Sequence, residues 1–116
     1  MAPGLRAALL CFAISLAAPG ASRALTLTPF EDTFHGTPLF GYYSPEKDKV
    51  REAVNQWIRQ SGQFDGVLDF DAVVRDPAHP AHVLAAYDAG DHLHPNDAAY
   101  VAMANSIDLD KLLGNH

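Results

Sequence analysis

Cysteine and clustered positive charge are both scarce in this chain of 116 residues. Its one cysteine, Cys11, cannot form a disulfide within the chain. Eight lysines and arginines are scattered among 14 aspartates and glutamates, which gives a formal net charge of −6. Nucleic acids and anionic membranes are bound by clustered Lys and Arg, so this balance argues against both kinds of partner. The length leaves room for one small domain.

Long hydrophobic runs are also lacking, since the longest, Ala7–Ala18, is too short to span a bilayer comfortably. Arg6 precedes it, Pro19-Gly20 follows it, and Ser22-Arg23-Ala24 places small residues at the −3 and −1 positions of a cut after Ala24. This order is typical of a secretory signal peptide. We therefore expect a signal peptide at residues 1–24, a mature chain (25–116) without a membrane span, and a secreted or periplasmic location. A buried apolar strand or helix is the alternative.

Two strand-like segments flank a well-marked helix. Leu25–Thr28 alternates leucine with threonine before Pro29 and predicts one short strand, and Gly66–Phe70 predicts a second. Between them, Ser44-Pro45-Glu46 has the residues of a helix start, and Gly62 suits the position after the helix end. A helix of roughly 17 residues between two strands forms a βαβ unit with parallel strands. Apolar residues at helical spacing predict the face that covers the sheet: Val50, Ala53, Val54, Trp57 and Ile58.

Two other segments leave alternatives open. Five aromatic residues between Phe30 and Tyr43 either line a pocket or pin this loop to the body of the protein by their rings. Asp69, Asp71 and Asp76 follow the second strand. These carboxylates either serve a site or, as we favour, cap a helical turn at Ala72–Arg75.

The segment Asp91-His92-Leu93-His94 leads into a helix start at Pro95-Asn96-Asp97. Residues three apart in a helical turn have Cβ atoms ~5–6 Å apart, so Asp91 can accept from Nδ1–H of His94 and leave Nε2 free as a base. Gly90 permits a turn before the acid, and Pro95 restricts the backbone after the histidine. Spacing alone leaves three interpretations: a catalytic pair, a helix-capping loop, or a metal site of Asp91, His92 and His94 that lacks a further ligand.

The block Asp91–Asp97 closely resembles the last sequence block of the SGNH (GDSL-type) esterases and lipases of secreted bacterial type. The likeness extends through LTLTPFEDTF (residues 25–34) and YYSPEKDKVREAVNQWIRQSGQFDGVLDFDAVVRDPAHP (residues 42–80) to essentially all of Leu25–Leu113. Ala89 and Ala99 stand where close relatives have Ser and Gly. The resemblance implies a partial flavodoxin-like, three-layer α/β/α SGNH hydrolase fold with a parallel sheet, of which residues 25–116 are the C-terminal portion.

The same resemblance implies hydrolysis of carboxylic esters by a Ser-His-Asp mechanism that uses no cofactor and no metal. Carried over by position, Asp91 is the triad acid, His94 is the general base and His92 is a neighbour outside the triad. The substrate would be a small-molecule ester of a lipid or of a carbohydrate.

The serine of such a triad is missing. No serine follows Gly-Asp, and neither Gly-x-Ser-x-Gly nor Gly-x-Asn-Asp occurs, since the serines are Ser15, Ser22, Ser44, Ser61 and Ser106. Two strands would also leave the sheet with an open edge and one uncovered face. We therefore expect the N-terminal half of the fold to be missing, a complementing N-terminal half to be a partner, and the chain to be inactive alone. The alternative is a non-catalytic secreted remnant or a small-ligand-binding module.

Overall fold

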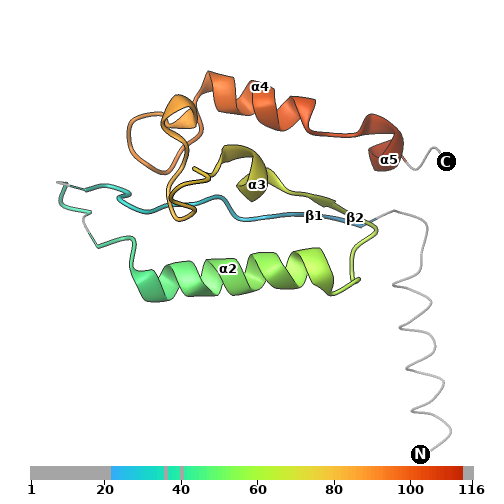
Figure 1. The fold of residues 1–116 in the computed structure, drawn as a ribbon, viewed down its shortest axis with the longest axis horizontal. Helices are drawn as coiled ribbons and strands as arrows, with labels where there is room; N and C mark the ends of the chain where they lie inside the picture. The colour runs from blue at the N-terminus through green and yellow to red at the C-terminus, as the bar shows by residue number, and fades with distance from the viewer. Residues whose placement is uncertain (1–21, 36, 40, 114–116) are drawn as a thin grey trace, which may run out of the picture.

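A two-stranded parallel sheet lies between helices in the computed structural model, which describes residues 22–35, 37–39 and 41–113. In chain order the elements are β1 (Arg23–Leu25), α2 (Pro45–Gln60), β2 (Gly66–Leu68), α3 (Phe70–Val74), the 3-10 helix η1 (Ala85–Tyr87), α4 (Asp97–Asn105) and α5 (Leu109–Leu113). Figure 1 shows α2 along one face of the sheet and α3 with α4 on the other. The fold is thus mixed α/β in three layers. The expectation of an uncovered face is wrong, because α3 and α4 cover it.

The predicted βαβ unit is confirmed, but both strands are shorter than predicted. β1 pairs with β2 in parallel, with Ala24 opposite Val67. β1 ends at Leu25 because Asn55 of α2 then takes the place of a strand partner: its side chain accepts from Leu27 N–H (2.7 Å) and donates to the Leu27 carbonyl (2.8 Å). β2 ends at Leu68 because Asp69 caps α3 and accepts from the N–H of Ala72. The capping role predicted for Asp69 is confirmed, although the helical turn begins two residues earlier than predicted.

The start of β1 bears on the predicted signal peptide, most of which (residues 1–21) lies outside the described residues. The backbone N–H of Ser22 donates to Asp65 (2.7 Å), and Arg23 donates to the Lys111 carbonyl (2.5 Å). The predicted cut after Ala24 falls inside β1, so a chain that begins at Leu25 would keep one of the three paired residues of this strand. Cleavage itself stays a prediction. Within the described residues, no helix has the length and apolar character needed to cross a membrane.

Helix α2 has the predicted ends but not the predicted buried face. The Ser44 side chain accepts from Lys47 N–H at the start, and Gly62 has a left-handed backbone (φ +69°) after the end. The predicted sheet-covering face is wrong for four of its five residues, of which Val50 is 63% exposed and Trp57 is 53% exposed, but Ile58 is buried as predicted. The helix instead buries four side chains, three of them polar or charged: Asp48, Arg51, Asn55 and Ile58.

An ion-pair network explains why this polar face can be buried. Arg51, which is 5% exposed, donates from Nε to Asp48 (2.6 Å) and from Nη1 to Asp71 (2.7 Å). Asp71 also accepts from Arg59 (2.7 Å) and from Arg75 (3.0 Å). Burial disfavours the charge of Arg51, but the hydrogen bonds to the two carboxylates outweigh it and raise the pKa of its guanidinium. The network fastens α2 to α3, since every buried charge in it has an opposite partner.

Candidate functional site

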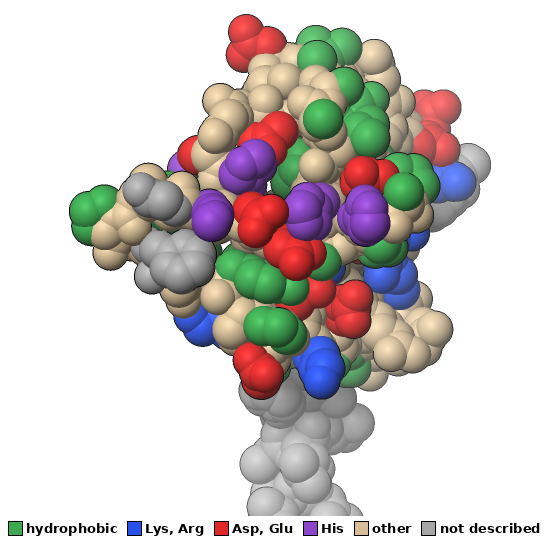
Figure 2. Space-filling model, turned by 60° about the vertical axis from the view of Figure 1, so that its left-hand side comes forward, with side chains coloured by type: hydrophobic (Ala, Val, Ile, Leu, Met, Phe, Trp, Pro, Cys, Tyr) green, Lys and Arg blue, Asp and Glu red, His purple; other side chains and the backbone are tan. Residues whose placement is uncertain are grey.

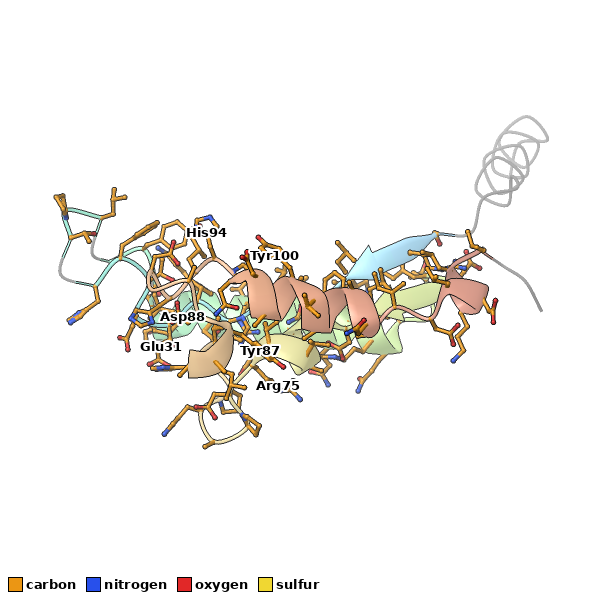
Figure 3. All side chains as sticks on the ribbon, turned by 90° about the horizontal axis from the view of Figure 1, so that it is seen from above. Glu31, Arg75, Tyr87, Asp88, His94 and Tyr100 are labelled. Atoms are coloured by element: carbon orange, nitrogen blue, oxygen red, sulfur yellow. The ribbon has the colours of Figure 1, made fainter. Side chains whose placement is uncertain are left out.

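The loop that carries the acid and the histidines lies at the carboxyl ends of the two strands. Figure 3 shows His94 and Asp88 at this end of the molecule, opposite the end where the chain enters β1. The loop is closed by backbone hydrogen bonds from Ala89 N–H to the His94 carbonyl (3.0 Å) and from Asn96 N–H to the Tyr87 carbonyl (2.9 Å). In parallel α/β sheets, ligand sites lie at this edge. The position therefore suits a functional site.

Two local features of the sequence shape the loop. Gly90 has φ +105°, so the predicted need for a glycine before the acid is confirmed. The Asn96 side chain accepts from Ala99 N–H and starts α4 as predicted, while its Nδ2 donates back to the Ala86 carbonyl (2.9 Å). Asn96 thus joins the end of η1 to the start of α4.

Asp91 and His94 form the pair that their spacing suggests. Asp91 Oδ2 lies 2.5 Å from His94 Nδ1, while Asp91 Oδ1 accepts from the N–H groups of Leu93 (3.0 Å) and His94 (2.9 Å). The hydrogen bond from His94 holds the pKa of the Asp91 carboxyl well below its usual range. An ionised carboxylate only accepts, so Nδ1 of His94 carries the proton. The capping and catalytic interpretations are therefore compatible, because one carboxylate makes both sets of contacts.

The remaining nitrogen of His94 is the one that could act as a base. The His94 side chain is 63% exposed, and no hydrogen bond to its Nε2 occurs among the described residues. With Nδ1 protonated, the neutral imidazole has its lone pair on Nε2. The pair therefore presents a basic nitrogen to the solvent.

A second acid–histidine pair lies beside the first. His92 Nδ1 is 2.5 Å from Asp88 Oδ2, and the Asp88 side chain is only 11% exposed. The sequence interpretation of His92 as a neighbour did not include this contact. The signal was present, because Asp88 precedes His92 by four residues, but that spacing alone is too common to be informative.

The loop after β1 supports the site from the other side. Thr33 is 2% exposed, and its hydroxyl lies within hydrogen-bond distance of the His92 carbonyl (2.9 Å) and of the Phe30 carbonyl. Phe34 N–H donates to the Asp91 carbonyl (3.4 Å). Asp32 and Phe34 have left-handed backbones, with φ of +62° and +57°, so this segment follows a strained path to reach the site loop.

Histidine and acidic side chains form a band across this end of the molecule, as Figure 2 shows. A third pair forms between His82 Nε2 and Glu31, which lie 3.1 Å apart. Among the residues that the structure describes, no group of three or more His, Cys, Asp and Glu side chains could hold a metal ion. His92 and His94 are instead paired with different carboxylates, Asp88 and Asp91.

An apolar groove of about 490 Å³ begins next to the site. Leu93, which directly precedes His94, lines it together with Phe30 and Tyr42. The same aromatic rings also pack edge to face on one another, with centroid distances of 6.0 Å for Phe30–Tyr42 and 5.7 Å for Phe34–Tyr42. The aromatic loop therefore lines a pocket, and its rings pack on one another within the loop.

The described serines all have structural contacts away from His94. Ser44 caps the start of α2, Ser61 lies at its end, and Ser106 follows α4. Ser22 hydrogen-bonds to Asp65 near the start of β1. None of them hydrogen-bonds to the imidazole of His94.

A parallel α/β unit with an acid–histidine pair at the carboxyl ends of its strands suits a hydrolytic enzyme. The GDSL-like lipase/acylhydrolase family model matches residues 6–107, and the chain belongs to this family of ester hydrolases. The match begins at Arg6, inside the segment predicted to be a signal peptide. No curated protein matches the chain.

Proposed function

We propose that this chain carries the acid–base part of a carboxylic-ester hydrolase, with Asp91 as the orienting acid and His94 as the general base. The observation that carries the proposal is the 2.5 Å contact between Asp91 Oδ2 and His94 Nδ1 beside an exposed Nε2. The nucleophilic serine would come from a polypeptide segment other than residues 1–116, because no Gly-Asp-Ser occurs among them.

The chemistry follows from the proton positions. Nε2 of His94 would take the proton of the serine hydroxyl as its oxygen attacks the ester carbonyl, and it would return that proton to the leaving alcohol. During this step the imidazole becomes a cation, and the Asp91 carboxylate beside Nδ1 stabilises it. A water molecule activated by the same nitrogen would then hydrolyse the acyl-serine.

An exposed apolar surface supports the idea of a complementing N-terminal half. Leu25 in β1 is 52% exposed, and the apolar face of α2 lies open beside it, with Val50, Val54 and Trp57. In the described residues only β2 pairs with β1, so the other edge of β1 is open. A strand that paired there would place its carboxyl end near His94, and a helix following it would cover the apolar face of α2.

Hydrolysis of p-nitrophenyl acetate tests the proposal. The purified chain should show no turnover, because loss of a nucleophile removes on the order of 10⁶-fold of the rate in a serine protease. Addition of an N-terminal half with Gly-Asp-Ser, taken from a secreted family member, should restore turnover. His94→Ala should abolish the restored activity, Asp91→Asn should lower it by roughly 10⁴-fold, and Asp110→Asn on α5 should leave it unchanged. Turnover by the chain alone that His94→Ala removes would contradict the proposal.

The substrate and the location are part of the same proposal. We infer an ester of a lipid or of a carbohydrate as substrate, and export to the cell exterior or periplasm directed by the apolar N-terminal segment. The contacts of Ser22 and Arg23 favour a mature protein that keeps these residues over one that is cut after Ala24.

A second candidate is a non-catalytic module that binds a small apolar ligand. The groove between Leu27, Phe30, Tyr42, Val50 and Val54 favours it, since apolar and aromatic walls with few polar groups are typical of ligand pockets. Titration with an apolar fluorescent probe separates the candidates. Probe binding that a complementing half does not displace would favour the module.

A further inference from the structure

Asp88 is as extensively bonded as Asp91, since each carboxylate of the site loop takes part in three hydrogen bonds. Its Oδ1 accepts from the backbone N–H groups of Gly90 (2.7 Å) and His92 (3.0 Å), and its Oδ2 contacts His92 Nδ1 at 2.5 Å. The carbonyl of Asp88 accepts from Asn96 Nδ2 (3.3 Å), which ties this residue to the start of α4. Asp88 is thus fixed to both ends of the loop.

These contacts converge on a residue with a strained backbone. His92 has φ +59°, a left-handed conformation that a side chain with a Cβ disfavours. The residue is held there at three points: its N–H and ring by Asp88, and its carbonyl by the Thr33 hydroxyl (2.9 Å). Strained backbone of this kind persists where the surroundings over-determine it.

The conformation of His92 sets the geometry of the neighbouring pair. His92 lies between Asp91 and His94, and its left-handed backbone forms part of the turn in which Asp91 Oδ1 accepts from the N–H groups of Leu93 and His94. The same turn brings Asp91 Oδ2 to His94 Nδ1. An extended backbone at residue 92 would carry His94 away from the carboxylate.

We propose that Asp88 is a positioning residue that acts through His92: it holds residue 92 in the left-handed conformation and thereby keeps Asp91 on Nδ1 of His94. The inference deepens the proposed function, because it concerns how the base of that site is oriented. Asp88 itself does not reach His94 and is not assigned a part in proton transfer. His92 contributes the left-handed turn of its backbone, and its ring contributes the hydrogen bond with Asp88 that helps to hold this turn.

The test is the protonation of the His94 ring, read by NMR in the full chain labelled with ¹⁵N at histidine. The spectrum reports which ring nitrogen carries the proton, so it needs neither activity nor a complementing half. A wild-type His94 without a proton on Nδ1 would contradict the proposed function as well, whereas failure of the variants alone would contradict only the role of Asp88. Wild-type protein should show His94 protonated at Nδ1. Asp88→Ala should cause loss of this fixed Nδ1–H state, and Asp88→Asn should retain it, because asparagine keeps an oxygen for the N–H groups of Gly90 and His92.

The double variant Asp88→Ala/His92→Gly gives the sharpest result. Glycine adopts the left-handed conformation without support, so this variant should regain the Nδ1–H state that Asp88→Ala loses. Asp76→Ala is the matched control, because the Asp76 side chain accepts a similar hydrogen bond from the Ala78 N–H (2.8 Å) in a separate loop. This variant should leave the protonation of the His94 ring unchanged.

Three results would overturn the inference. They are a wild-type His94 without Nδ1 protonation, an Asp88→Ala variant whose His94 matches the wild type, and a double variant that does not recover. If Asp88→Ala does not fold, folding of the double variant supports the role assigned to residue 92. Failure of both to fold would show that Asp88 serves the stability of the whole chain instead.

Discussion

Removal of the Asp71 carboxylate should destabilise the protein far more than removal of an exposed acid on α2. Asp71 is 3% exposed and accepts from Arg51, Arg59 and Arg75, so Asp71→Ala leaves a buried guanidinium at Arg51 with fewer partners. Breaking a buried ion pair from one side costs about 3–5 kcal/mol. Because Arg51 keeps Asp48 and Arg59 keeps Asp69, we expect the lower end, about 3 kcal/mol.

Urea unfolding followed by far-UV circular dichroism measures this loss, because α2 is the longest described helix. With a slope of about 1–3 kcal/mol per molar urea, the midpoint should fall by roughly 1–3 M. Glu52→Ala on the exposed side of α2 should change the free energy of unfolding by less than about 0.5 kcal/mol. Arg75→Ala should cost at most about 1 kcal/mol, because this arginine is partly exposed. Equal midpoints for Asp71→Ala and Glu52→Ala would refute the role given to the network.

Two further predictions concern stability. Arg59 lowers the pKa of Asp69 from 3.8 to about 2. The stabilisation from this pair should therefore be complete above about pH 4 and lost as the pH falls through about 2. The melting temperatures of wild type and Asp69→Asn should converge at the acidic end, and a constant difference across this pH range would contradict the prediction. A chain that begins at Leu25 should melt at a lower temperature than one that begins at Ser22, because it lacks two of the three paired residues of β1, and equal melting temperatures would show that these residues are dispensable.

The features that the sequence predicted well are those encoded by neighbouring residues. Ser44 and Asn96 cap helices through contacts three residues away, and Gly90 provides a positive φ within its own turn. The Asp91–His94 contact belongs to the same group, since three residues separate its partners. Such contacts depend little on the remainder of the fold, so spacing and residue type are enough to predict them.

The buried face of α2 could not be predicted in this way. Helical periodicity identifies the apolar stripe with Val50 and Val54, but it cannot say which face the sheet will contact. That choice depends on distant partners: Arg51 reaches Asp71, and Asn55 reaches Leu27. Asp88 was missed for a related reason, because its importance comes from the strained backbone of His92, and a positive φ at a histidine has no signal in the sequence.

The error about α2 is itself informative about function. Four of the five apolar side chains predicted to lie against a sheet are exposed, while the polar face of the same helix is buried in an ion-pair network. Exposed apolar side chains on one side of a helix, next to a strand edge that no other described strand pairs with, indicate a surface that another element covers. That edge of β1 leads to the end of the sheet where His94 exposes Nε2. A parallel strand added there would bring a serine at its carboxyl end to His94, and the helix that follows it would cover the stripe. One complementing segment would therefore supply both the missing nucleophile and the missing cover of α2.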